Sequence, residues 1–346
     1  MSKLSVALLF GGRSQEHEIS IMSARSVYSV LDKEKYTVIP FAISKKGHWI
    51  KPEKSLNILK DENINQVDIN KKTLLTSSFK CFLEENIDLV LPVLHGPYGE
   101  DGRLQGLLEM LNITYIGSGV LGSAAGMDKA VMKDLFFCND IPQGKYITIN
   151  KFDLKNNFDE LKKLIEQEIS LPCFIKPANM GSSIGISKIN ELFELEEALQ
   201  EAFKYDYKVV IEENISAREV ECSVLGNIDI QTSLPGEIKS MSEFYDYKAK
   251  YEDDSTKLVI PANIPVKIID EIRDLAVKAY KAIDCRGFAR VDFFLTEENE
   301  ILVNEINTIP GFTRYSMYTK MWEATGIKYS DLIDKIIELA LEWHSL

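Results

Sequence analysis

Cysteine and histidine are both scarce in this sequence, and neither is spaced as a structural site requires. The five cysteines are scattered and odd in number, and none belongs to a C-x-x-C pair. This pattern argues against a disulfide framework and against a zinc site built on cysteine. The four histidines include no H-x-x-x-H pair, which argues against a zinc enzyme. We therefore expect reduced cysteines and a cytoplasmic protein.

Long apolar runs are missing as well. The first run, Val6 to Phe10, stops at Gly11 and Gly12 and is too short for a signal sequence. No stretch reaches the roughly 18 apolar residues that a membrane-spanning helix needs. We therefore expect no signal sequence and no membrane contact.

Basic residues are in the minority. The chain has 40 Lys and Arg against 53 Asp and Glu, and its formal net charge is −13. A field of this sign repels the phosphates of nucleic acid, so general nucleic-acid binding is not expected. A small anion can still be held by a local basic pocket, and acidity therefore does not argue against ATP.

The chain does contain enough apolar material for a large core. Its 346 residues are 45% hydrophobic and 27% charged, and at roughly 100–200 residues per domain this length suggests two or three domains. The first third alternates strands and helices, while the polar stretch 51–73 predicts surface structure of variable form. Strands are expected at 6–10, 36–43, 87–94 and 113–116, and helices at 19–31 and 104–111. This βαβ order indicates an α/β, Rossmann-like region with a parallel sheet.

The rest of the chain predicts an α+β arrangement. A small unit has helices at 127–138, 159–169 and 192–203 and strands at 172–176, 184–189 and 208–213. A last region has strands at 219–225, 286–295 and 300–305 and helices at 265–283 and 331–343. The polar, aromatic stretch from about 234 to 262 is typical of a lid over a functional site. We divide the chain into residues 1–117, 118–212 and 213–346, with the lid in the last part.

Two pairs of polar residues interrupt apolar strands near the C-terminus. Arg290 and Asp292 form one i, i+2 pair, and Glu305 and Asn307 form the other. Residues two apart on a strand point to one face, so adjacent strands would bring all four together. Their hard oxygen atoms suit Mg²⁺, and Arg290 could neutralise a phosphate or an oxyanion. Alternation alone slightly favours an ordinary solvated face, but the flanking apolar runs make buried polar residues costly unless they have a function.

A second motif is the segment from Lys176 to Gly185, KPANMGSSIG. Its glycines and serines offer backbone N–H groups that can surround an anion, and Lys176 can reach a phosphate. The spacing does not match a P-loop, G-x-x-x-x-G-K-[ST]. A plain hairpin turn is the alternative, at about even odds if the segment is considered alone.

Several weaker candidates complete the set. Glu16 follows Gly11 and Gly12 and could bind an amine, although an acid is also common at a helix N-terminus. The loop from His95 to Gly102 is either a ligand loop or a solvated turn. Lys129 opposes the dipole preference at its helix start, which a nearby anion would explain, although a surface lysine is the commoner case.

Taken together and in order, these motifs resemble the D-alanine–D-alanine ligases of the ATP-grasp superfamily. The resemblance covers almost the whole chain. It is carried by these segments: 11–20, His95-Gly96 with 99–102, Met127-Asp-Lys129, Lys176-Pro177, 181–185, 245–251, 287–292 and 304–311. It implies an ATP-grasp fold that follows a Rossmann-like N-terminal domain, with ATP bound between the central and C-terminal parts.

The resemblance also implies a role for each matching residue. Lys129 and Lys176 would contact phosphates, Glu219 the ribose, and Asp292, Glu305 and Asn307 two Mg²⁺ ions, which Mn²⁺ could replace. Glu16 would bind the amino group of the first D-alanine, His95 would contact a substrate, and Arg290 and the Gly311 N–H would form an oxyanion site. Glu213, Asn214 and Ile215 would form the adenine hinge, and the rest of the ATP site would include Glu212, Ser182, Ser183 and Lys250. Ser316 and Met317 would border the second D-alanine. Ser182 and Tyr251 would link the lid to Glu16 by hydrogen bonds.

The implied activity is ATP-dependent joining of two D-alanine molecules through an acyl phosphate, for peptidoglycan precursor synthesis, by a homodimer. The alternative is a ligase that joins D-alanine to D-lactate or D-serine. Tyr251 favours D-alanine, because several depsipeptide-forming members have phenylalanine there. An inactive nucleotide-binding module is the alternative from another class, and it is disfavoured because Lys176 and every implied metal ligand are present.

Overall fold

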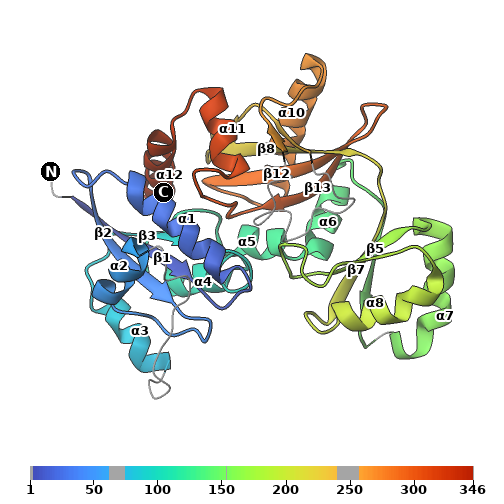
Figure 1. The fold of residues 1–346 in the computed structure, drawn as a ribbon, viewed down its shortest axis with the longest axis horizontal. Coiled ribbons are helices and arrows are strands. Elements are labelled where there is room, and N and C mark those ends of the chain that lie inside the picture. The colour runs from blue at the N-terminus through green and yellow to red at the C-terminus, as the bar shows by residue number, and fades with distance from the viewer. Residues whose placement is uncertain (1–2, 62–74, 153, 240–256, 346) are drawn as a thin grey trace.

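Three separate β-sheets organise the chain in the computed structural model, which describes residues 3–61, 75–152, 154–239 and 257–345 (Figure 1). One sheet belongs to the N-terminal part, one to the middle of the chain and one to the C-terminal part. The C-terminal sheet lies between the other two in Figure 1. No helix in these ranges has both the length and the apolar character needed to cross a bilayer.

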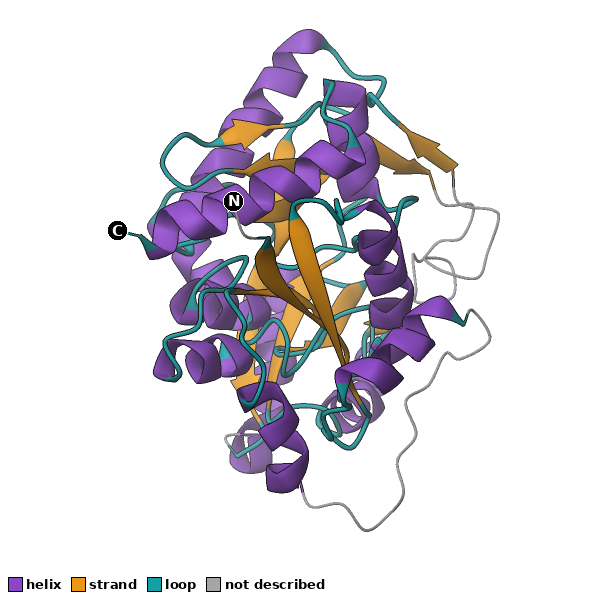
Figure 2. Ribbon diagram, turned by 90° about the vertical axis from the view of Figure 1, so that its left-hand side faces the viewer, coloured by secondary structure: helices purple, strands orange, loops and turns teal. Residues whose placement is uncertain are grey.

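The N-terminal sheet is parallel, as predicted. Its described strands run in the order β2 (Tyr36–Ile43), β1 (Leu4–Gly11) and β3 (Leu89–Val93), and all pairings are parallel. Helices flank these strands on both sides (Figure 2). They are α1 (His17–Val30), α2 (Pro52–Lys60), α3 (Leu75–Leu83) and α4 (Arg103–Met110). The α/β prediction for this region is therefore confirmed.

Strand β1 shows why its sequence is a continuous apolar run. Val6, Leu8 and Phe10 pack in one core with α1, while Ala7 and Leu9 pack in another with α4. A strand covered on both faces has no solvated side, so alternation disappears.

One local prediction in this region was wrong, and another is covered only in part by the described residues. The expected strand at 113–116 forms only one bridge, between Tyr115 and Val90, because Gly117 turns the chain away with φ of +102°. The polar stretch at 51–73 begins with the regular helix α2, which has Pro52 in its first turn. Residues 62–74 of that stretch lie outside the described residues.

The middle sheet is antiparallel. Its described strands run in the order β4 (Tyr146–Asn150), β7 (Lys208–Glu213), β5 (Cys173–Pro177) and β6 (Ser187–Ile189). Two helices cover this sheet, α7 (Leu154–Leu164) and α8 (Leu195–Ala202). Helix α7 continues into a π-helical turn at Ile165–Ile169, and α8 follows a 3₁₀ turn at Leu192–Glu194. The predicted strand at 184–189 is shorter than expected, because the turn through Gly185 occupies its start.

The C-terminal sheet has six strands among the described residues. Strands β11 (Lys257–Val259), β10 (Gly236–Lys239), β8 (Arg218–Leu225), β12 (Phe288–Leu295) and β13 (Ile301–Asn307) are neighbours in that order, and β9 (Gln231–Thr232) pairs with β8. Helices α5 (Val120–Met127), α6 (Lys129–Cys138) and α10 (Val266–Ala282) pack into its core. The predicted α+β character is confirmed, whereas α5 and β4 were not predicted.

The last two helices join the C-terminal sheet to the N-terminal core. Helix α11 (Met317–Thr325), also not predicted, contacts β8, and α12 (Tyr329–His344) contacts α1. Trp322, Leu332 and Ile336 share one buried cluster with β1. Sheet membership changes near residues 117 and 212, but this one cluster contains residues on both sides of each position. The three-part division of the chain stays a prediction.

The predicted lid falls mainly outside the described residues. Residues 240–256, including Lys250 and Tyr251, are not described. The two ends of the predicted stretch are regular and not irregular as expected, because β10 and β11 pair antiparallel with Glu237 opposite Val259.

Candidate active site

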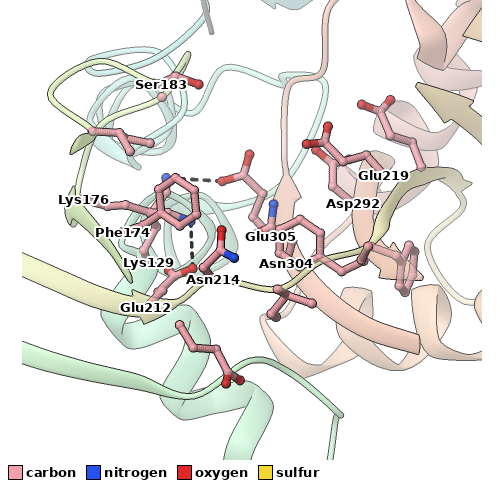
Figure 3. A pocket seen from close by; sticks show the side chains of 18 of the residues that line it. Lys129, Phe174, Lys176, Ser183, Glu212, Asn214, Glu219, Asp292, Asn304 and Glu305 are labelled. Carbon is pink, nitrogen blue, oxygen red and sulfur yellow. Dashed lines mark hydrogen bonds and ion pairs between the residues drawn. The ribbon is translucent and has the colours of Figure 1, made fainter. Parts of the chain in front are cut away.

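A cleft between the middle and C-terminal sheets collects most of the predicted ATP and metal residues (Figure 3). Lys176 comes from β5, Lys129 from α6, and Asp292 and Glu305 from the C-terminal sheet. The other predicted residues that line the cleft are Ser182, Ser183, Glu212, Glu213, Asn214, Ile215 and Glu219. Lys129 and Lys176 therefore line the same cleft as Asp292 and Glu305.

The two polar pairs lie on adjacent strands, as their spacing predicts. In the antiparallel register of β12 and β13, Arg290 is opposite Asn307 and Asp292 is opposite Glu305. The register shifts directly after Asp292. This irregularity leaves consecutive residues Asn304 and Glu305 both lining the cleft.

Arg290 is surrounded by acids. Its Nε and Nη2 atoms donate to the two Asp292 oxygens, each at 2.7 Å, and Nε also lies 3.0 Å from Glu221 Oε2. Burial lowers the pKa of Arg290, but the charges of Asp292 and Glu221 outweigh it and hold this pKa well above the usual range. Arg290 is therefore a permanent cation in a fixed orientation.

Sequence reasoning missed Glu221. It is 5% exposed and lies opposite Asp292 on β8. It stands two residues after Glu219, so the same period-two argument used for Arg290 and Asp292 places both glutamates on one face. That face is the one that lines the cleft.

The donor set suits a divalent cation that prefers oxygen. Asp292 and Glu305 supply carboxylates. Asn307 donates from Nδ2 to Asp292 at 3.0 Å, so its amide oxygen takes no part in that bond. Over the described residues, no group of three or more His, Cys, Asp and Glu side chains could hold a metal. The protein therefore offers two carboxylates and an amide, a set that fits a metal whose coordination is completed by phosphate and water.

The lysines opposite these acids are held in ion pairs. Lys129 donates to the Met180 carbonyl at 2.8 Å and lies 3.3 Å from Glu305 Oε2. It occupies the first position of α6, which Asp128 caps by accepting from two backbone N–H groups. Lys176 donates to Glu212 at 2.7 Å. Each lysine is therefore paired with a carboxylate. A bound phosphate would have to replace that carboxylate or bind the lysine together with it.

The Gly/Ser loop joins this cleft to the N-terminal region. Ser182 and Ser183 both take left-handed backbone angles, with φ of 51° and 58°. The Ser182 hydroxyl donates to Glu16 Oε1. Glu16 precedes α1 but makes no side-chain cap bond, so its carboxylate serves this contact and not the helix.

The loop that begins at His95 lies beside the Glu16 carboxylate. His95 is 5% exposed, and it contacts Ser23 and the Ile309 carbonyl through its two ring nitrogens, each at 3.1 Å. Glu100 accepts the Gly96 N–H at 2.6 Å, and burial together with the charge of Glu16 raises the pKa of Glu100 to about 8. Gly96 has φ of +76°, a backbone conformation that favours glycine, and a Cβ atom there would lie 2.8 Å from the Glu16 carboxylate. These contacts favour a ligand loop over a solvated turn.

Some predicted residues lie away from the cleft lining. Ser316 directly precedes α11, and its hydroxyl accepts the Thr313 N–H, while Met317 is 7% exposed and packs with Ile238 and Met321. A Cβ atom on Gly311 would lie 3.0 Å from the Ser316 hydroxyl, so the two positions are close. Met317 therefore acts at least as a core residue. Glu213 does line the cleft, but it accepts the Lys145 N–H at 2.6 Å, so its carboxylate is directed to the backbone.

Comparisons with known proteins cover nearly the whole chain and agree on one family. The family model described as "D-ala D-ala ligase N-terminus" matches residues 5–118, and "D-ala D-ala ligase C-terminus" matches residues 135–338. A D-alanine–D-alanine ligase of Halothermothrix orenii is 58% identical over 342 residues, which cover 99% of both chains. One from Bacillus pumilus is 46% identical over 349 residues, covering 99% of this chain and 97% of the relative.

Solved structures give the same result. The D-alanine–D-alanine ligase of Coxiella burnetii superposes with a TM-score of 0.84 at 34% identity, covering 100% of this chain and 96% of that chain. The VanG D-Ala:D-Ser ligase of Enterococcus faecalis gives 0.82 at 37% identity, covering 98% and 100%.

Proposed function

The chain belongs to the D-alanine–D-alanine ligase family, and from this premise we propose that the cleft between its middle and C-terminal sheets is the active site. The enzyme is an ADP-forming ligase with the ATP-grasp fold. It joins two D-alanine molecules into D-alanyl-D-alanine for peptidoglycan precursor synthesis and uses ATP and a divalent metal. The observation that supports this site most strongly is the opposition of Lys129 and Lys176 to Asp292 and Glu305 across one cleft.

ATP is proposed to lie along the cleft with its phosphates at the lysines. Lys129, Lys176 and the loop at Ser182 and Ser183 would bind phosphates, and Glu219 the ribose. Glu212, Glu213, Asn214 and Ile215 would line the adenine. Asp292, Glu305 and Asn307 would hold two Mg²⁺ ions, with Mn²⁺ able to replace them. The bound metal supplies charge neutralisation on the transferred phosphoryl group.

The D-alanine molecules are proposed to lie between this cleft and the N-terminal region. The Glu16 carboxylate, fixed by Ser182, would bind the amino group of the first D-alanine, and His95 would border it. Ser316 and Met317 would lie near the carboxylate of the second. Lys250 and Tyr251 lie outside the described residues, and their roles at the phosphates and over Glu16 stay predictions.

The reaction would then proceed in two steps. A carboxylate oxygen of the first D-alanine attacks the γ-phosphorus, the bond to ADP breaks, and an acyl phosphate forms. The amine of the second D-alanine attacks the acyl carbon and loses a proton, and phosphate leaves with the attacking oxygen. Arg290 and the Gly311 N–H would stabilise the oxyanion of the tetrahedral intermediate. Because water would hydrolyse the acyl phosphate, the site must exclude it.

Product analysis tests this function against the related ligations. With D-alanine, D-lactate and D-serine supplied together at neutral pH, we expect D-alanyl-D-alanine as the main product and phosphate release that depends on D-alanine. The D-lactate or D-serine alternative would instead show a mixed dipeptide or depsipeptide as the main product. ATP binding without phosphate release would indicate a binding module.

We also propose that the enzyme is a homodimer formed through the N-terminal region. Met110, at the end of α4, is 90% exposed, and Leu121, at the start of α5, is 65% exposed. Leu111 and Val120 add to this apolar surface, and α4 and α5 contact each other. Exposed apolar side chains on two contacting helices suit a self-complementary interface.

Replacing Met110 and Leu121 together with glutamate should convert the dimer to a monomer, because two buried charges would face each other across a symmetric interface. Sedimentation equilibrium should then report 39.3 kDa, the mass of one chain. Leu164→Glu, at an exposed position on α7, should leave the dimer intact. A wild-type enzyme that sediments as a monomer would contradict the proposal.

A cytoplasmic location completes the proposal. All five cysteines carry free thiols in the structure, and three of them are buried. Reduced cysteines suit a reducing compartment, where ATP is also available.

A further inference from the structure

Lys133 is a buried lysine behind the proposed ATP site, and no role has yet been assigned to it. It lies one helical turn after Lys129 on α6, so both side chains project from the same face of the helix. Lys129 lines the cleft, whereas Lys133 does not and has a side chain only 2% exposed. A lysine is rarely buried to this degree without a charged partner.

The partner of Lys133 is Glu212. The Lys133 Nζ atom lies 3.6 Å from Glu212 Oε1, while Lys176 donates to the other oxygen, Oε2, at 2.7 Å. Burial raises the pKa of Glu212, but the charges of Lys133 and Lys176 outweigh it, so the pKa of Glu212 lies below its usual value. Burial lowers the pKa of Lys133 against the attraction of Glu212. The Tyr146 ring lies 5.5 Å from the Lys133 ammonium.

We propose that Lys133 is a positioning residue that holds the Glu212 carboxylate while Lys176 leaves it for the phosphates of ATP. This inference rests on the proposed function, because it takes the phosphates to be bound by Lys176. The two lysines use different oxygens of Glu212, so one can depart while the other remains. Lys133 cannot replace Lys176 at the phosphates, since it stays behind the lining of the cleft.

The energetic consequence concerns the availability of Lys176. A buried carboxylate that loses one of two cations binds the remaining one more strongly, because the loss of both would leave an unpaired buried charge. Without Lys133, Glu212 would depend on Lys176 for its neutralising charge. The phosphates of ATP would then have to compete with Glu212 for Lys176. Lys133 therefore lowers the cost of moving Lys176 from Glu212 to a phosphate.

The first test is Lys133→Met, which removes the charge and keeps an unbranched side chain. We expect the KM for ATP to rise by about tenfold, while kcat and the KM for D-alanine change by less than about threefold, within the usual range of coupling between contacting charges. Lys163→Met, at an exposed position on α7, is the matched control and should behave as wild type. A KM for ATP within about twofold of wild type in Lys133→Met would overturn the proposal.

A double-mutant cycle separates positioning from packing. In a Glu212→Gln background there is no carboxylate to compete for Lys176, so Lys133→Met should change the KM for ATP by less than about threefold. A similar increase in both backgrounds would show that Lys133 acts only through packing, which also overturns the proposal. If Lys133→Met does not fold, Lys133→Gln takes its place with the same expected increase.

The wild-type enzyme distinguishes this inference from the function on which it rests. If wild type shows no ATP-dependent ligation of D-alanine, the proposed function fails and no KM is defined. If wild type ligates D-alanine and the cycle shows no coupling, only the role of Lys133 fails.

Discussion

Replacing Asp292 with asparagine is expected to lower kcat for D-alanine ligation by about 10³-fold, because a metal that neutralises the transferred phosphoryl group supplies several kcal/mol of stabilisation. Asn307 and Arg290 both bond to Asp292, so the change affects a metal donor and a clamp together. Asparagine has almost the same shape as aspartate, and the strand should therefore keep its register. Steady-state ligation at several Mg²⁺ concentrations measures the effect, and saturation should need more Mg²⁺ than in wild type.

A second substitution tests the metal site without changing the Arg290–Asp292 pair, although it also weakens the ion pair between Glu305 and Lys129. Glu305→Gln leaves the bond between Arg290 and Asp292 in place, and we expect a loss of kcat in the same direction. Glu298→Gln, in the exposed turn between β12 and β13, is the matched control and should retain wild-type turnover. Normal turnover in both Asp292→Asn and Glu305→Gln would contradict the metal assignment.

Replacing Arg290 with lysine is expected to lower kcat by about 10²-fold to 10³-fold with little change in the KM for ATP, as for the loss of an oxyanion donor. Lysine keeps the positive charge that Glu221 and Asp292 require, but it lacks the planar fork that donates to Asp292 through two atoms. A loss of activity without a loss of stability would therefore point to geometry. Initial rates together with thermal denaturation make this distinction.

The control for Arg290 lies on the same segment of chain. Arg286 stacks on Trp343 and bonds to Asp284, outside the cleft. Arg286→Lys should therefore leave kcat unchanged. If Arg290→Lys also retained more than about a third of wild-type kcat, the oxyanion role of Arg290 would be wrong.

Local periodicity accounts for what could be predicted from the sequence. Strands β2 and β7 were predicted with the bounds observed, because β-branched and apolar residues fill them between clear breaks. The i, i+2 spacing likewise predicted that Arg290 and Asp292 would share a face with Glu305 and Asn307. In both cases the residues lie close together in sequence, within one strand or on two consecutive strands.

Contacts between distant segments account for what was missed. Glu221 meets Asp292 only because β8 pairs with β12, two strands more than 60 residues apart in sequence. Lys133 meets Glu212 only because α6 packs beside β7. A helical-face argument from Lys129 could have marked Lys133, but no local pattern shows that Glu212 lies opposite.

Oxygen transfer tests most directly whether the enzyme joins D-alanine through an acyl phosphate. D-alanine labelled with ¹⁸O in its carboxylate should be incubated with ATP, Mg²⁺ and the enzyme, and the released phosphate analysed by mass spectrometry. Because the carboxylate oxygen that attacks phosphorus leaves with it, each phosphate released during ligation should carry one ¹⁸O atom. Dipeptide formation with unlabelled phosphate would contradict the account.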